Sequence, residues 1–198
     1  MRQNQYPCED VVPIEEEPRH HLVFVNEFVR AFAVEIAPRE RSLCHHHAHD
    51  YLMYVVGDAQ IVSAPRDGEP RTHTYHDGDC ELSPAGLVHV VENLRVTAFR
   101  NVVLELLPRL GKLQRGTEPR IVAGNGTVQA IFHEELVTVW ALEMKADGRA
   151  EVYGPAIVAA LNADSVKGIS WIAGERGPAG PDLGRSARAV LFQLGRPE

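Results

Sequence analysis

The feature that most constrains the fold of this chain is a series of short apolar runs that begins at Leu22. The runs LVFV, FVRAFAVEIA and YLMYVV are rich in Val, Phe and Ile, and turn residues separate such runs at intervals of about 8–12 residues. Further strands are expected at residues 59–64, 71–76, 79–83, 89–92 and 100–106. About eight strands in this span predict an all-β protein closed into a jelly-roll barrel.

Composition narrows the range of partners. Among 198 residues, 27 acidic side chains exceed 20 basic ones, which gives a formal net charge of −7. This excess argues against a nucleic acid or an anionic membrane surface as partner and favours a small molecule. Cys8, Cys44 and Cys80 are odd in number and lack C-x-x-C spacing, so a disulfide framework is not expected. With no apolar segment of membrane-spanning length, a cytoplasmic location is predicted.

A histidine-rich segment, CHHHAHDYLMYVV, carries the chemistry. Side chains of an extended strand alternate between two faces, so His45, His47 and His49 are expected on one face and His46 on the other. Tyr51 would share the first face. Three neutral imidazoles that converge from two strands suit zinc, iron, nickel, copper or manganese.

A second segment, residues 78–93, is expected to supply the other strand of the metal site. Gly78, Pro84, Gly86, His89 and Asn93 fit the spacing G-x5-P-x-G-x2-H-x3-N at every defined position. This spacing resembles the second sequence motif of the cupin superfamily. The glycines are expected at turns with positive φ, and Asn93 at a turn rather than at a metal.

The resemblance extends in part to the first cupin motif, G-x5-H-x-H-x3/4-E-x6-G. His45-x-His47 is present, but Tyr51 stands where the shorter spacing expects Glu, and Asp50 lies seven residues before Gly57. The resemblance implies that His45, His47 and His89 are the ligands of a divalent metal ion. Asp50 is expected to cap or pair at the surface.

Two residues are predicted to take part in chemistry beside the metal. Tyr51 would donate a hydrogen bond to a bound oxygen atom, and His49 would carry a proton near neutral pH or add a fourth ligand. Arg100 or Asn101 could supply an inward polar group to an anionic substrate. The remaining histidines have no spacing partner and are expected to be ordinary: His20, His21, His73, His76 and His133.

The chain divides into an N-terminal arm (1–21) that is expected to be solvated, a metal-binding cupin barrel (22–107), a linker (108–127) and a second β-rich domain (128–198). The second domain resembles the first, because Phe32-Ala33-Val34-Glu35 aligns with Trp140-Ala141-Leu142-Glu143. Gly86, Arg100 and Leu106 align with Gly174, Arg188 and Leu194, in a copy that is 20 residues shorter. His89 then falls on Gly177, so a degenerate, metal-free barrel in a bicupin-like tandem is predicted. It would serve as scaffold, lid or homodimer surface.

Two functions from different classes follow. One is a metal-dependent enzyme, most simply an iron-dependent oxygenase that acts on a small anionic or enolisable substrate. The other is a metal-binding or ligand-binding cupin module without turnover. The fold alone does not decide between them, because unrelated activities share it.

Overall fold

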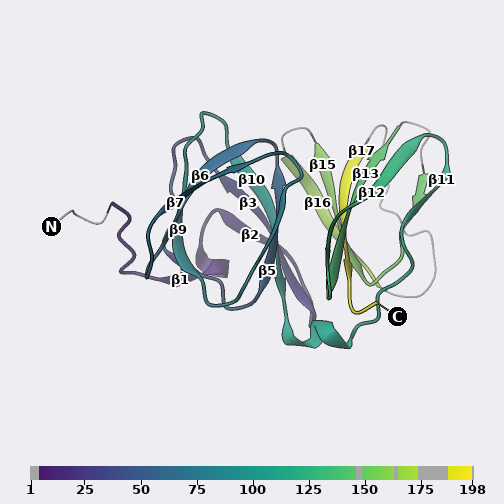
Figure 1. Ribbon diagram of the computed structural model, residues 1–198, viewed down its shortest axis with the longest axis horizontal. Helices are drawn as coiled ribbons and strands as arrows, with labels where there is room; N and C mark the ends of the chain where they lie inside the picture. The colour runs from purple at the N-terminus through teal and green to yellow at the C-terminus, as the bar shows by residue number, and fades with distance from the viewer. Residues whose placement is uncertain (1–4, 146–148, 163–164, 174–186, 198) are drawn as a thin grey trace. The chain divides into compact units, whose positions relative to one another are not determined.

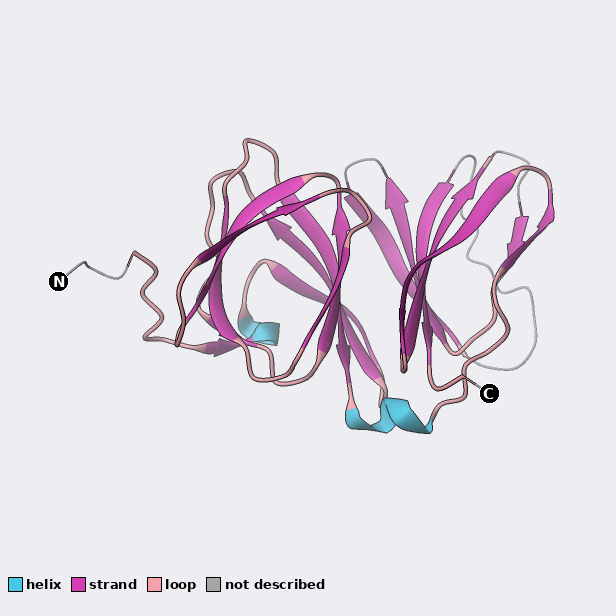
Figure 2. Ribbon diagram, in the orientation of Figure 1, coloured by secondary structure: helices cyan, strands magenta, loops and turns pink. Residues whose placement is uncertain are grey.

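The computed structural model describes residues 5–145, 149–162, 165–173 and 187–197. Two short 3-10 helices, η1 (Ile14–Glu16) and η2 (Pro108–Lys112), accompany the strands (Figure 2). Neither helix has the length and apolar character needed to cross a membrane, and no other helix occurs among the described residues. The chain separates into two compact units, residues 1–23 with 30–106 and residues 24–29 with 107–198.

The first unit contains a complete jelly roll (Figure 1). Eight consecutive strands form two four-stranded sheets, ordered β3-β10-β5-β8 and β4-β9-β6-β7, and β2 and β1 extend one sheet each. This order is that of a jelly-roll barrel. The strands are β1 (Val12–Pro13), β2 (His20–Val25), β3 (Val29–Ile36), β4 (His45–His46), β5 (Tyr51–Val56), β6 (Ala59–Pro65), β7 (Arg71–Tyr75), β8 (Cys80–Ser83), β9 (Val88–Asn93) and β10 (Phe99–Leu106).

The interior of this barrel follows from strand periodicity. Phe32, Val34 and Ile36 alternate along β3 and are buried in one cluster with inward residues of β5, β6, β9 and β10. Ile14 joins the same cluster, at 1% exposure. All-β architecture, and a jelly-roll barrel in particular, is therefore confirmed for this unit.

The N-terminal segment is not the solvated arm that the sequence predicted. Val12 and Pro13 pair with β4 in parallel, and Tyr6 and Glu17 are buried. Of the three consecutive glutamates, Glu15 and Glu16 face solvent. The polar composition of this segment predicted exposure to solvent. The segment is instead buried in part, because β1 pairs with β4 and because hydrogen bonds satisfy the buried carboxylate of Glu17.

Cysteine pairing also differs from expectation. Cys8 and Cys44 form a disulfide with a Cα–Cα distance of 5.1 Å, and Cys80 is a free thiol. Burial first, and then the charge of Asp79, raise the pKa of Cys80 to about 12. Cys80 therefore behaves as a small apolar side chain rather than a nucleophile.

The second unit has one large sheet ordered β12-β13-β17-β15-β16 and a two-stranded sheet β11-β14. This order matches β2-β3-β10-β5-β8 of the first unit, strand for strand. The strands are β11 (Arg120–Ala123), β12 (Gly126–Glu134), β13 (Val137–Met144), β14 (Arg149–Glu151), β15 (Ala156–Asn162), β16 (Ser165–Ile172) and β17 (Ala187–Leu194). Residues 108–127, predicted to be a linker, contain η2, β11 and the start of β12 and belong to this unit.

The structure shows where the second half of the chain is shorter than the first. Between β5 and β8 the first unit inserts the hairpin β6-β7, whereas β15 and β16 pair directly and only residues 163–164 separate them. Gly174 and Gly177, which the repeat aligned with Gly86 and His89, lie outside the described residues. That the second unit is a degenerate cupin barrel therefore stays a prediction.

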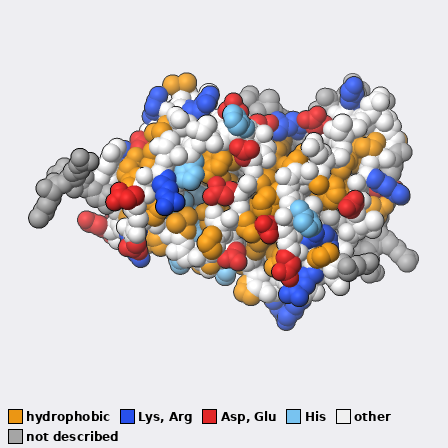
Figure 3. All heavy atoms as spheres, in the orientation of Figure 1, with side chains coloured by type: hydrophobic (Ala, Val, Ile, Leu, Met, Phe, Trp, Pro, Cys, Tyr) orange, Lys and Arg blue, Asp and Glu red, His pale blue; other side chains and the backbone are white. Residues whose placement is uncertain are grey.

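The surface shows mixed charge. On the face drawn in Figure 3, the described acidic and basic side chains are interspersed among apolar and neutral ones. This part of the surface has no continuous basic track of the kind that binds a phosphate backbone.

Asn93, the last residue of the second motif, holds loops rather than a ligand. Its Nδ2 donates to the carbonyl oxygens of Ile36, Ala37 and Thr97, and its Oδ1 accepts from the N–H of Arg95. We expect Asn93→Ala to lower the free energy of unfolding by roughly 2–4 kcal/mol, because several buried groups lose their partner.

Urea unfolding of the metal-free protein measures this effect. The control is Gln60→Ala on the exposed side of β6, which should change stability by less than about 0.5 kcal/mol. Equal unfolding midpoints for the two variants would contradict the structural role of Asn93.

Candidate metal centre

Backbone pairing brings the two histidine segments together. His45 on β4 lies directly opposite His89 on β9 in an antiparallel register. Gly86 has φ +92° and donates its N–H to the carbonyl of His47, while the N–H of His47 donates to the carbonyl of Leu87. The positive φ predicted for Gly86 and for Gly78 is confirmed. The motif glycine thus fixes the turn against which His47 is held.

Three imidazoles predicted as ligands converge in the barrel interior. His45, His47 and His89 are 0%, 2% and 6% exposed. The Nε2 atom of His89 lies 3.2 Å from that of His45 and 3.3 Å from that of His47. Donor atoms about 2.0–2.1 Å from one metal ion are separated by about 3.0–3.4 Å, so these spacings fit a common ion.

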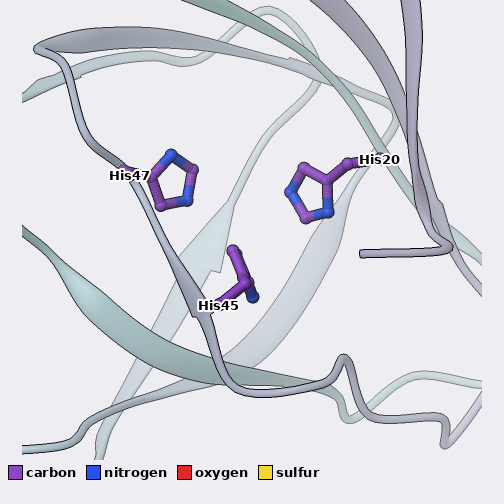
Figure 4. Close-up of side chains that lie close together, drawn as sticks. All are labelled: His20, His45 and His47. Atoms are coloured by element: carbon purple, nitrogen blue, oxygen red, sulfur yellow. The ribbon is translucent and has the colours of Figure 1, made fainter. Parts of the chain in front are cut away.

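A fourth imidazole comes from the opposite sheet. His20 begins β2, and one ring nitrogen from each of His20, His45 and His47 lies within 4.8 Å of the other two. Figure 4 shows these three rings around a shared space. His20 was expected to be ordinary, and this expectation is wrong. The sequence signal is Glu17-x-x-His20, in which the Glu orients the ring, but nothing local shows that β2 faces β4.

Hydrogen bonds orient the rings from behind. His45 Nδ1 lies 3.0 Å from the carbonyl oxygen of Leu43, and His20 Nδ1 lies 2.8 Å from Glu17 Oε2. A carbonyl and a carboxylate only accept, so each Nδ1 carries the hydrogen and each Nε2 keeps its lone pair. His89 Nδ1 lies 2.9 Å from Ser63 Oγ. Metal-binding histidines use their second nitrogen in this manner.

The environment keeps His45, His47 and His89 neutral. Burial first, and then the neighbouring His20 imidazole, lower the pKa of His45 to about 4. Burial and neighbouring imidazoles also lower the pKa of His47 and of His89. The lone pairs are therefore available at neutral pH, and the donor set fits a divalent cation without proton release.

Glu17 is a buried carboxylate with a full set of donors. Burial raises its pKa, but hydrogen bonds from His20, Leu43 and Arg19 outweigh this and lower the pKa to about 2. Arg19 Nη1 lies 3.1 Å from Glu17 Oε1. The contact of Glu17 with His20 Nδ1 fixes the tautomer and the orientation of the ring, which supports His20 as a ligand.

The cluster borders a cavity with about 590 Å³ of space not filled by protein atoms, open solvent at its mouth included. Much of the lining is apolar, with Val, Ile, Met and Phe side chains from β3, β5, β6, β9 and β10 and with Leu87 from the turn before β9. The polar lining residues outside the imidazole cluster are Tyr51, Ser63, His73, Tyr75, Glu81, Ser83 and Asn101. Apolar walls with a few convergent polar groups are typical of small-molecule sites.

The two residues predicted for catalysis lie in different places. Tyr51 lines the cavity and stacks on His47, with ring centroids 4.0 Å apart. Burial raises its pKa to about 12, although a hydrogen bond with Ser83 lowers it, so the phenol keeps its proton. His49 does not line the cavity, and its charge interacts with Glu105. The reason is that β4 ends at His46, so strand alternation does not extend to His49.

The neighbouring polar residues follow the expected pattern in part. Asp50 Oδ1 accepts the N–H of Ala85 and so caps the turn before Gly86. Arg100 pairs with Glu35 outside the cavity, whereas Asn101 lines it.

Comparisons with known proteins concern the fold. No family model matches this chain, and no curated protein matches it. A cupin domain from Bordetella pertussis is 23% identical with a TM-score of 0.42, covering 44% of this chain and 90% of that one. An RmlC-like cupin with a double-stranded β-helix from Methanocaldococcus jannaschii is 14% identical with a TM-score of 0.39, covering 54% and 93%. A double-stranded β-helix protein from Klebsiella pneumoniae is 20% identical with a TM-score of 0.39, covering 48% and 82%.

The strand order of the first unit and the residues of the second motif agree. Eight strands form the jelly roll, with Gly86 at the turn, His89 in the imidazole cluster and Asn93 at the loops that it holds. The first unit is therefore a jelly roll that carries a motif resembling the second cupin motif. It brings His20, His45 and His47 close enough together to hold a metal ion, and His89 lies beside His45 and His47.

We expect purified protein to hold about one divalent metal ion per chain and the variants His20→Ala, His47→Ala and His89→Ala to lose most of it. Removal of one ligand weakens the shared coordination. Elemental analysis measures metal content, and His49→Ala is the control that should retain it. Full metal content in His89→Ala would contradict the assignment.

We also expect Glu17→Gln to lower metal affinity by about 10–100-fold without removing a ligand, because His20 loses its charged partner. Competition with a chromophoric chelator measures affinity, and thermal unfolding of the metal-free protein reports any structural damage. Glu16→Gln changes the exposed neighbour and is the matched control. The same affinity in both variants would show that Glu17 does not support the site.

Proposed function

We propose that this protein is a divalent-metal-dependent enzyme that acts on a small anionic or enolisable substrate, with iron-dependent oxygenation as its reaction. The observation that carries the proposal is the position of the four imidazoles at the border of a cavity whose lining is in large part apolar. His20, His45, His47 and His89 would hold the ion. The ion, when bound, would supply Lewis acidity and, as ferrous iron, dioxygen chemistry.

The preference for an anionic substrate rests on charge. All four donors are imidazoles, and Glu17 contacts His20 Nδ1 from behind rather than entering the group. A divalent ion therefore keeps more of its positive charge than it would with a carboxylate ligand. An enolate or carboxylate oxygen compensates for that charge better than a neutral group does.

Tyr51 is the residue best placed to act on a bound oxygen atom. Its ring is held by stacking on His47, and its phenol is protonated at neutral pH. It can orient and donate a hydrogen bond, while the apolar walls restrict water. His49 has no part in the proposal, because it does not line the cavity.

A module that binds metal without turnover is the second candidate function, and one observation favours it. If all four imidazoles bound one ion, they would fill the tetrahedral shell that zinc adopts in structural sites and would leave no position for a substrate. Iron, nickel and manganese accept more ligands, so the identity of the ion separates the two functions.

Oxygen consumption tests the proposal. Metal-free protein is loaded with ferrous iron without oxygen, mixed with small diketones, keto acids and thiols, and then exposed to oxygen. We expect one substrate class to drive oxygen uptake and Tyr51→Phe to slow it by about 100-fold with iron retained, because the variant lacks only the donated proton.

The controls are the zinc-loaded protein, which should consume no oxygen, and Tyr153→Phe, whose hydroxyl contacts Glu151 in the second unit. Absence of oxygen uptake with every metal and substrate, together with saturable ligand binding, would overturn the enzyme in favour of the module.

A further inference from the structure

The cavity contains a buried amide that the metal centre does not use. Asn101 lies on the inner face of β10 between Phe99 and Val103, and all three residues line the cavity. Asn101 is 2% exposed, and its Oδ1 atom is buried without a hydrogen-bond partner. A buried acceptor without a donor is unfavourable, and proteins retain such groups where a ligand supplies the missing partner.

A carboxylate lines the same cavity. Glu81 on β8 accepts a hydrogen bond from the hydroxyl of Tyr75, with an O–O distance of 2.6 Å. Burial and this hydrogen bond raise the pKa of Tyr75, so the tyrosine remains the donor and Glu81 the acceptor. His73 stacks on Tyr75 with ring centroids 5.8 Å apart, which steadies the tyrosine ring. Two strands therefore hold the Glu81 carboxylate at the cavity wall.

The charge of the lining is asymmetric. It includes Glu81 but neither Lys nor Arg, and its basic side chains are all imidazoles. An anionic group of a ligand that lay beside Glu81 would meet repulsion without a compensating cation. A hydrogen-bond donor would instead find an acceptor in the Glu81 carboxylate or in the Asn101 carbonyl.

We propose that the substrate carries an ammonium group on a part of the molecule other than the one at the metal centre, and that Glu81 recognises it, with Asn101 as a further acceptor in the same cavity. This inference rests on the proposed function, which places an anionic oxygen at the metal centre. The substrate class is thus a small zwitterion, and dicarboxylates are disfavoured. Glu81 and Asn101 determine specificity and leave the metal centre intact.

Binding to cobalt-loaded protein at pH 8 tests the inference, because anions that reach the ion change its visible absorption. The probes are ω-amino acids of three to six carbons, each paired with the unbranched fatty acid of matched length and with the corresponding α,ω-dicarboxylate. We expect at least one amino acid to bind about 10-fold more tightly than its matched fatty acid, and the dicarboxylate to bind more weakly than both.

Two variants assign this preference to residues. Glu81→Gln should bring the amino acid and the fatty acid to within about 2-fold of each other and should strengthen dicarboxylate binding. Asn101→Ser should reduce the preference in part. Both should keep the cobalt content of the unchanged protein, which a folding defect would not allow, and Glu69→Gln on the exposed turn should bind like the unchanged protein.

The outcomes separate this inference from the proposed function. If carboxylates perturb the cobalt spectrum without regard to the distal group, or if Glu81→Gln keeps the preference, the inference fails and the proposed function stands. If no carboxylate perturbs the spectrum, the anionic substrate of the proposed function fails, and the inference fails with it.

Discussion

The first unit depends on the burial of several imidazoles around one point. Lone pairs of His20 and His45 are fixed by acceptors behind the rings, and His89 places its Nε2 about as close to two neighbours as ligands of one ion lie. Without a cation, such lone pairs repel one another in a medium of low dielectric constant. Burial opposes protonation as an alternative solution. A metal ion satisfies the charge and the geometry together.

The jelly roll makes this arrangement attainable. His45 and His89 come from adjacent strands of one sheet, and His20 comes from the edge strand of the other. A histidine set that spans both sheets connects them across the interior, in addition to the apolar core around Phe32, Val34 and Ile36. The N-terminal segment is thereby part of the site, since Glu17 and His20 are buried and contact each other there.

The sequence predicted those parts of the site that depend on local spacing. Short apolar runs between turn residues predicted most of the strands of the barrel, and the second motif identified His89 and the turn at Gly86. His20 could not be predicted, because its contact with His45 depends on how two sheets face each other. His49 was expected on the same face as His45 and His47, on the assumption of one continuous strand. β4 is only two residues long, so the alternation of side chains does not continue to His49. Asn101 was a candidate for an inward polar group, because it lies in a predicted strand, and it does line the cavity. Glu81 was not predicted, because its place in the cavity lining has no pattern in a linear sequence.

The hairpin β6-β7 distinguishes the two units. It supplies Ile61, Ser63, His73 and Tyr75 to the cavity wall, and Ser63 also contacts the Nδ1 atom of His89. In the second unit β15 leads to β16 with two residues between them, and the five-stranded sheet keeps its order and a buried core around Trp140, Leu142 and Leu191. If the second half arose as a copy of the first, loss of this one hairpin would remove part of a cavity wall and the hydroxyl beside the motif histidine in a single event, while the five-stranded sheet would survive. Selection would then no longer maintain imidazoles in that half, and none follows His133 in the sequence.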